Sequence, residues 1–153
     1  MVSLPCRSLG ASIFLAVALF AHLGSAGAAS FENSAAHVRI AGIDYVRDGG
    51  DKAIIRIVID PGYHINANPA SEKYLIPTAV NIADETPSRV IYPAAVKFTP
   101  QFASAPIDVY QGNIEIIVER TSSGAPHLSG TLTVQACTDQ ICLPPADLPL
   151  PAS

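Results

Sequence analysis

Positive charge is scarce in this sequence of 153 residues. Nine Lys and Arg side chains stand against thirteen Asp and Glu side chains, which gives a formal net charge of −4. A surface of this sign repels the phosphates of nucleic acid and of anionic lipid headgroups. We therefore expect neither nucleic acid nor an anionic membrane surface among the partners of the protein.

Long hydrophobic runs are also missing, apart from one at the N-terminus. Residues 11–23 are mostly apolar, follow Arg7 and precede a run of Gly, Ala and Ser, which is typical of a cleaved secretory signal. The run is shorter than the roughly 20 apolar residues that a membrane-spanning helix needs. The sequence predicts a signal peptide at residues 1–29 and one domain at residues 30–153 that is exported through the secretory route and does not insert into the membrane.

No amphipathic helix pattern of useful length follows residue 30, whereas strand patterns are frequent. Runs rich in β-branched residues recur between turn residues at intervals of about 8–12 residues, which is typical of a β-sandwich. The thirteen prolines favour edge strands and loops over long helices. We predict an all-β fold with a polar loop at 66–73, and a tail after Pro145 that is either a last edge strand or a frayed end. The predicted strands are 38–43, 53–60, 63–66, 78–83, 89–92, 96–99, 113–120 and 130–136.

Cysteine is rare too, and its placement is informative. Cys6 lies in the predicted signal peptide, so the exported domain keeps only Cys137 and Cys142, in a compartment where disulfides persist. A strand ending at Cys137, a tight turn and an extended return at Cys142 would bring the two Cα atoms within the roughly 4.4–6.8 Å that a disulfide needs. A bridge that closes about six residues contributes only about 2 kcal/mol. The spacing alone leaves a structural disulfide, a redox pair and a metal site open.

The sequence around the cysteine pair has neither the motif of a thioredoxin site nor the ligands of a metal site. A Cys-x-x-Cys motif with a following helix, as in thioredoxin, is absent. The four histidines show no paired spacing, and two thiolates alone do not complete a metal site, so we expect no metal and no other cofactor. Between Cys137 and Pro145 there is no Lys, Arg or His, while Asp139 is present. No local positive charge is therefore expected to activate either thiol.

Residues 134–145, Val-Gln-Ala-Cys-Thr-Asp-Gln-Ile-Cys-Leu-Pro-Pro, resemble the active-site region of the N-terminal periplasmic domain of the thiol–disulfide interchange protein DsbD. Residues 61–68, 74–78 and 109–112 agree with that family in the same order, so the resemblance extends over about 38–150. It implies an immunoglobulin-like antiparallel β-sandwich that carries the cysteine pair on one edge.

The resemblance also implies a function as a periplasmic thiol–disulfide exchange module. Such a module is reductase-like but turns over only with protein partners: it receives electrons from a membrane-embedded thiol reductase, here acting in trans, and passes them to periplasmic thioredoxin-fold proteins. Those recipients are of the disulfide isomerase or cytochrome c maturation type. In that family the second cysteine, here Cys142, forms the link to the partner, and Cys137 would resolve it. The alternatives are a non-catalytic interaction domain with a structural disulfide and a metallochaperone-like binder.

Five further residues are predicted to surround the pair by this resemblance. A short cap loop with an aromatic tip shields the cysteines in that family, and the matching stretch here is 108–112, with Val109 at the tip and Tyr110 beside it. Asp108 would keep the thiols protonated. His64 and Asn66 share a face of the strand expected beside the cysteines, and His64 would donate or accept a proton during exchange.

Overall fold

The computed structural model describes residues 32–47, 51–83, 86–87, 89–121 and 127–151. The predicted signal peptide, residues 1–29, lies outside these ranges. In the part of the chain that is described, no helix combines the length and the apolarity needed to span a membrane.

The described residues form an all-β fold with one short 3-10 helix, η1 (Ser34–Ala36). The strands, in chain order, are β1 (Val38–Val46), β2 (Lys52–Ile59), β3 (His64–Asn66), β4 (Ala79–Ile82), β5 (Arg89–Ile91), β6 (Val96–Phe98), β7 (Ile107–Tyr110), β8 (Asn113–Glu119), β9 (Gly130–Val134), β10 (Ala136–Cys137) and β11 (Ala146–Pro149). Each of the eight predicted runs overlaps one of these strands, and the run 130–136 spans β9 and reaches into β10.

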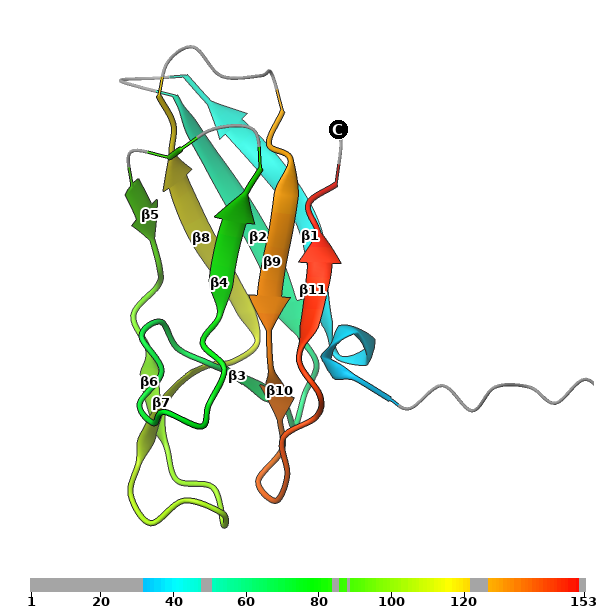
Figure 1. The fold of residues 1–153 in the computed structure, drawn as a ribbon, viewed down its shortest axis with the longest axis vertical. Coiled ribbons are helices and arrows are strands. Elements are labelled where there is room, and N and C mark those ends of the chain that lie inside the picture. The colour runs from blue at the N-terminus through cyan, green and yellow to red at the C-terminus, as the bar shows by residue number, and fades with distance from the viewer. Residues whose placement is uncertain (1–31, 48–50, 84–85, 88, 122–126, 152–153) are drawn as a thin grey trace, which may run out of the picture. The chain divides into compact units, whose positions relative to one another are not determined.

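The strands form three antiparallel sheets, in the orders β1-β2-β8-β5, β11-β9-β4 and β10-β3-β7-β6. Figure 1 shows the first sheet behind the second, as the two layers of a sandwich, and the third sheet at the lower end of the view. The predicted immunoglobulin-like β-sandwich is confirmed. The tail is a strand as well: among the described strands β11 pairs only with β9, and this edge position tolerates Pro149, which has no amide hydrogen to donate.

Strand β2 shows how the sequence builds the sandwich. Its β-branched residues alternate between the two faces of the sheet, so that Ile55 and Ile57 are almost fully buried while Arg56 is exposed. Ile55 and Ile57 share the main hydrophobic core with Ile116 of β8 and Leu132 of β9. Full burial of each such side chain stabilises the fold by about 1.5–3 kcal/mol, which gives the cysteine-bearing end a rigid support.

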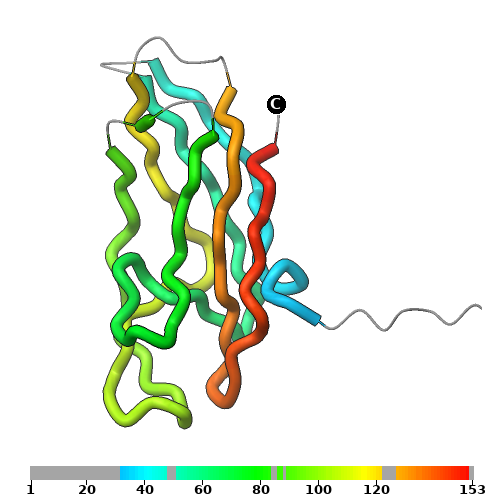
Figure 2. The backbone as a smooth tube through the Cα atoms, viewed as in Figure 1, coloured from blue at the N-terminus to red at the C-terminus, as the bar shows by residue number. Residues whose placement is uncertain are grey.

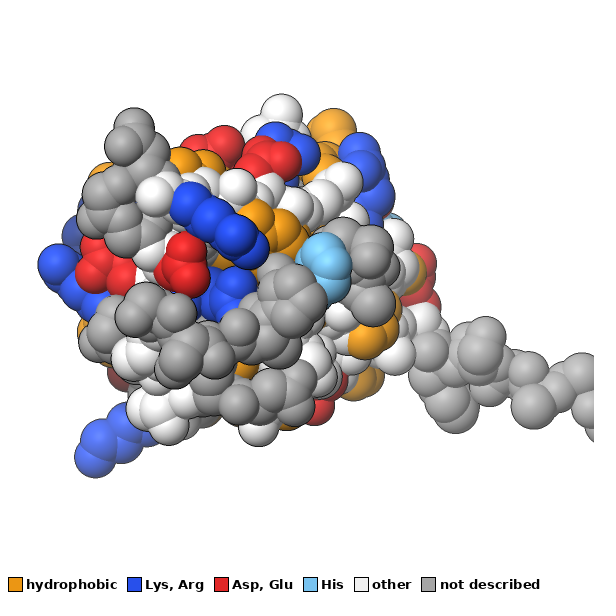
Figure 3. Space-filling view, turned by 90° about the horizontal axis from the view of Figure 1, so that it is seen from above, with side chains coloured by type: hydrophobic (Ala, Val, Ile, Leu, Met, Phe, Trp, Pro, Cys, Tyr) orange, Lys and Arg blue, Asp and Glu red, His pale blue; other side chains and the backbone are white. Residues whose placement is uncertain are grey.

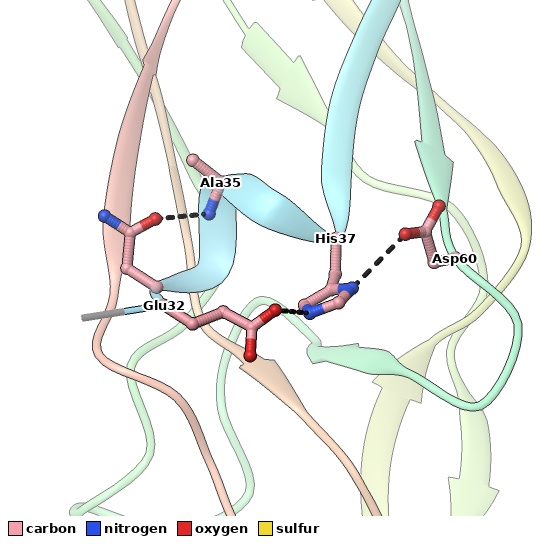
Figure 4. A network of polar contacts seen from close by, with 5 residues as sticks. Glu32, Ala35, His37 and Asp60 are labelled. Atoms are coloured by element: carbon pink, nitrogen blue, oxygen red, sulfur yellow. Dashed lines mark hydrogen bonds and ion pairs between the residues drawn. The ribbon is translucent and has the colours of Figure 1, made fainter. Parts of the chain in front are cut away.

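Polar contacts fix η1 against the start of β1. The side chain of Asn33 accepts a hydrogen bond from the amide of Ala35 at 3.0 Å and so caps the helix. The His37 ring lies between two carboxylates, with Nε2 3.0 Å from Glu32 and Nδ1 3.3 Å from Asp60 (Figure 4). Because Asp60 directly follows β2, these contacts attach η1 to the sandwich.

The two ends of the sandwich differ in character. At the end drawn uppermost in Figure 1, Lys52 of β2 lies 3.7 Å from Glu119 of β8, and Figure 3 shows Lys and Arg beside Asp and Glu there. At the other end, Figure 2 shows the turn after β10 and the loop between β6 and β7 reaching farthest from the sheets. This second end carries both cysteines.

Candidate functional site

Cys137 and Cys142 face each other across a tight hairpin, residues 136–144, which we call the cysteine hairpin. They form an antiparallel bridge and a disulfide, with Cα atoms 3.9 Å apart, closer than the range expected from the sequence. Backbone hydrogen bonds flank the pair on both sides, from Thr138 N to Ile141 O at 2.8 Å and from Leu143 N to Ala136 O at 2.9 Å. The cysteines therefore occupy a non-hydrogen-bonded position, where side chains of facing strands come closest.

The sequence of the turn favours this geometry. The hydroxyl of Thr138 accepts hydrogen bonds from the amides of Gln140 and Ile141, both at 3.2 Å. A threonine that binds the backbone two and three residues ahead stabilises a turn. Asp139, between them, remains exposed.

Ser34 of η1 forms hydrogen bonds to both arms of the cysteine hairpin, at Ala136 and at Pro144. Its hydroxyl accepts a hydrogen bond from Ala136 N at 2.8 Å and donates one to Pro144 O at 2.7 Å. The Ser34 amide donates to the same Pro144 carbonyl at 3.0 Å. Ser34 is fully buried, so the hairpin has a fixed base that does not depend on the disulfide.

The two cysteines differ in exposure. Cys137 is fully buried (0 % exposed), whereas Cys142 is half-buried. Cys142 opens on a surface cleft of about 330 Å³, the Cys142 cleft, in which Tyr74 and Ile141 are 60 % and 58 % exposed. The other residues of the cleft are Leu75, Phe102, Gln135 and Gln140. The lining has no charged side chain, and only the Cys142 side of the disulfide is accessible to another protein from it.

His64 lies beside Cys137, as the sequence predicted. Strand β3 pairs with β10 so that His64 is directly opposite Cys137. The His64 side chain is 1 % exposed, its ring packs 4.6 Å from that of Phe98, and its Nε2 atom has no hydrogen-bond partner among the described residues. Burial lowers the pKa of His64 to about 4, against an opposing effect of the Asp139 carboxylate.

Asn66 shares the face of β3 with His64 but has a structural role. Its Nδ2 donates to Ile76 O and to Gln135 Oε1, both at 3.0 Å, and its backbone carbonyl accepts from the Thr78 hydroxyl at 2.7 Å. These bonds tie the segment after β3 to the residue before the cysteine hairpin. They hold one wall of the Cys142 cleft, to which Gln135 contributes.

The predicted cap at 108–112 is wrong in its position. Residues Ile107–Tyr110 form strand β7, in which Val109 and Tyr110 are 0 % and 2 % exposed. Their side chains point to opposite faces: Val109 packs in a cluster with Leu75, and Tyr110 packs in the main core. The Tyr110 hydroxyl accepts a hydrogen bond from Asn68 N at 3.1 Å, and burial raises its pKa. A segment buried on both faces is a central strand and does not form an exposed loop tip.

Phe102 is an aromatic residue outside the predicted cap that shares a cleft with Cys142. It belongs to the loop 99–106 between β6 and β7, packs in the same apolar cluster as Cys142 and lines the Cys142 cleft. Gln101, its neighbour, is bound to Asp139 in the cysteine hairpin by two hydrogen bonds, one from its backbone amide and one from its side chain. Two features of the sequence mark this loop, an aromatic residue and prolines on both sides at Pro100 and Pro106.

Asp108 makes its contacts away from the cysteines. Its carboxylate lies 2.9 Å from Lys97 Nζ and 3.3 Å from the Ser71 hydroxyl. The hydrogen bond from Lys97 is the main reason why the pKa of Asp108 is lowered. The acidic residue coupled to the site is Asp139, which acts on His64. In the ranges that the structure covers, no group of three or more His, Cys, Asp or Glu side chains is placed to hold a metal ion.

Comparisons with known proteins point to one family. A family model described as the N-terminal part of the thiol:disulfide interchange protein DsbD matches residues 35–148. Among solved structures, the fold is similar to the N-terminal periplasmic domain of ScsB from Proteus mirabilis, with a TM-score of 0.53 and 20 % sequence identity over 74 % of this chain and 46 % of that chain. It is also similar to the reduced N-terminal domain of DsbD from Neisseria meningitidis, with a TM-score of 0.51 and 18 % identity over 71 % of this chain and 80 % of that chain.

The chain thus spans less than half of the ScsB chain with which it was compared. At these identities both likenesses concern the fold. A comparison with curated protein sequences gives no match.

Proposed function

Since this chain belongs to the family of N-terminal domains of the thiol:disulfide interchange protein DsbD, and is a thiol–disulfide interchange domain, we propose that its Cys137–Cys142 pair exchanges electrons with thioredoxin-fold proteins in the periplasm. The observation that carries the proposal is the unequal exposure of the two cysteines. Cys142 opens on an apolar cleft at the surface, while Cys137 is buried behind it. A partner sulfur can reach Cys142, whereas the buried Cys137 reacts only with Cys142, in the second step of the exchange.

The exchange consists of two displacements at sulfur. In the first, the Cys142 thiolate attacks a disulfide of the partner, so that a mixed disulfide forms and the other partner sulfur leaves as a thiolate. In the second, the Cys137 thiolate attacks the Cys142 sulfur, which restores the intramolecular disulfide and expels the remaining partner sulfur. Two electrons pass to the partner, and the two thiol protons of the pair end on the partner thiols.

The reducing equivalents come from a membrane-embedded thiol reductase, which runs the same two displacements in reverse. Recipients are thioredoxin-fold proteins of the disulfide isomerase or cytochrome c maturation type. The support for both is the likeness of residues 134–145 to the DsbD active-site region, together with the uncharged rim of the Cys142 cleft. Tyr74 and Ile141 give this rim an exposed apolar surface, which suits an apolar active-site loop.

Phe102 takes the role of the aromatic cap in this scheme. It lines the cleft through which the partner must reach Cys142, and the hydrogen bonds between Gln101 and Asp139 hold its loop in place. Docking of a partner displaces Phe102 and exposes Cys142. Small thiol reagents, which make few contacts, displace it inefficiently and therefore react slowly with Cys142.

The reduction potential of the pair tests the proposal. The protein is equilibrated with glutathione buffers of known potential, and the fraction of reduced pair is measured by alkylation. Structural disulfides lie below about −300 mV, while disulfides that take part in exchange lie higher. A potential above that limit, together with reduction of an oxidised disulfide isomerase by the dithiol form, is the expected result. A potential below it, without transfer, would show that the bridge is structural.

A further inference from the structure

One row of side chains crosses three neighbouring extended segments at the site. His64 of β3 is paired with Cys137 of β10, and Cys137 is paired with Cys142. Residues directly opposite each other in antiparallel strands point to the same face, with Cβ atoms about 4.5–5.5 Å apart. The His64 imidazole is therefore the neighbour of Cys137 on the side away from Cys142.

The oxidised pair leaves this imidazole incompletely bonded. His64 is 1 % exposed, and its Nε2 has no hydrogen-bond partner among the described residues. A buried polar atom without a partner is costly. A disulfide has no hydrogen to offer, but a Cys137 thiol does, and it arises only when the pair is reduced. A neutral imidazole accepts a hydrogen bond or a proton at one of its two ring nitrogens, so the reduced form of Cys137 can supply the hydrogen that the disulfide lacks.

The groups around His64 allow its imidazole to be neutral at rest and to accept a proton during the reaction. A second cleft, of about 320 Å³, is lined by His64 together with Asp139 of the cysteine hairpin and Asp60 and Tyr63 of the turn between β2 and β3. On β6 the neighbour is the uncharged ring of Phe98. Burial keeps His64 neutral at pH 7, and Asp139 favours its protonated form, as would a thiolate forming beside it. The cleft gives the proton a route to solvent.

We propose that His64 accepts the proton of the Cys137 thiol in the step that releases the partner. This assignment rests on the proposed function. The proton moves from the Cys137 sulfur to His64, and the electron pair left on that sulfur forms the bond to Cys142. The bond between Cys142 and the partner breaks, and the partner sulfur departs with its electron pair. His64 then returns the proton to the departing thiolate or to water in the cleft.

The test follows the two displacements separately with 5,5′-dithiobis(2-nitrobenzoate) as a probe. Reduced protein releases one coloured thionitrobenzoate when Cys142 attacks the reagent and a second one when Cys137 resolves the mixed disulfide. Because this leaving group needs no proton, the second phase reports the deprotonation of Cys137. Both rates are recorded by stopped flow from pH 5 to pH 9 for the wild type, His64→Gln, His64→Phe and the control His37→Gln.

We expect His64→Gln and His64→Phe to slow the second phase by at least about tenfold at pH 7. The pH at which this phase reaches half its maximal rate should rise to that of an unassisted thiol, about 8.5 or above. The first phase should stay within about threefold, and His37→Gln should match the wild type in both phases. Cooperative thermal unfolding of each variant establishes that it is folded.

Three results would overturn the assignment. A second phase with unchanged rate and pH profile in folded His64→Gln would show that no proton passes through His64. Equal slowing of both phases would indicate a purely structural role. A wild-type protein that releases thionitrobenzoate without closing its own disulfide would contradict the proposed exchange function itself, and the assignment to His64 would fall with it.

Discussion

Ser34 and Pro144 are joined by two hydrogen bonds although 110 positions separate them in the chain. The amide and the hydroxyl of Ser34 both donate to the Pro144 carbonyl, and the same hydroxyl accepts from Ala136. Pro144 and Ala136 lie on the two arms of the cysteine hairpin. One buried serine therefore holds the base of the hairpin together independently of the sulfur–sulfur bond.

Replacing Ser34 by Ala should destabilise the domain by about 1–3 kcal/mol, because the amide of Ala136 is left buried without an acceptor. The loss should be larger in the reduced protein than in the oxidised one, in which the disulfide still joins the arms. Urea unfolding of both redox forms measures the difference. Ser71→Ala, which removes an exposed hydroxyl bonded to Asp108, serves as the control and should cost less. Equal losses in the two redox forms would contradict the role of Ser34.

Reduction of the wild-type protein should leave it folded. The disulfide closes only about six residues and contributes about 2 kcal/mol, whereas a domain of this size has about 5–15 kcal/mol of stability. Calorimetry with and without reductant should show a lower melting temperature but still one cooperative transition. Loss of that transition on reduction would favour a purely structural disulfide.

Single cysteine variants should separate the roles of the two sulfurs. Cys137→Ser leaves the accessible Cys142 without its resolving partner, so mixed disulfides with periplasmic proteins should accumulate. Cys142→Ser retains only the buried Cys137 and should trap little. Non-reducing electrophoresis of each variant after incubation with an oxidised disulfide isomerase gives the readout, and both variants should be folded and inactive in exchange. Equal trapping by the two variants would contradict the assignment of different roles to the two cysteines.

Removing the Phe102 ring should expose Cys142 to small reagents. We expect Phe102→Ala to raise the rate of alkylation of the reduced protein by iodoacetamide severalfold, with little change in stability because Phe102 is only half-buried. Val109→Ala is the informative comparison. It should lower the melting temperature through lost packing in β7 and leave the alkylation rate nearly unchanged. If Val109→Ala raised the alkylation rate and Phe102→Ala did not, the cap would lie at 108–112, as the resemblance implied.

Burial of His64 should make the oxidised domain less stable in mild acid. Its pKa is about 4 in the folded state against 6.5 for an ordinary histidine, so between these values the unfolded chain binds a proton that the folded protein does not. Stability is therefore unaffected by His64 above about pH 6.5 and falls as the pH drops toward 4, by about 3 kcal/mol in total. Urea unfolding at several pH values should show that stability declines less steeply with falling pH in His64→Phe than in the wild type. Equal slopes for the two proteins would contradict this role of His64.

The strands were predictable because β-branched runs and turn residues carry a local signal, as in β2, where Ile55 and Ile57 alternate with Arg56 and Val58. Strand β7 was missed because its stretch was assigned to a cap loop by resemblance. Its own pattern, Ile-Asp-Val-Tyr, has the β-branched and aromatic residues of a strand. Strand β10 is only two residues long, which is too short for any periodic pattern.

The site was predictable only in part. The pairing of Cys137 with Cys142 and the place of His64 beside them follow from local spacing and from the family resemblance. Ser34 was not predictable, because a hydrogen bond to a backbone group more than 100 positions away leaves no local pattern. The attachment of Gln101 to Asp139 depends in the same way on how two distant loops meet in space.

The hydrogen bonds between Gln101 and Asp139 connect the loop 99–106, which carries Phe102, to the segment that the disulfide closes. Asp139 lies within the six-residue ring that the disulfide closes, and Gln101 is its only bonded neighbour in the 99–106 loop among the described residues. When the ring opens, the segment that anchors the loop gains freedom, so the mobility of the loop becomes a readout of the redox state. A fluorophore placed at Ser104, on the exposed side of this loop, would report electron transfer without touching either sulfur.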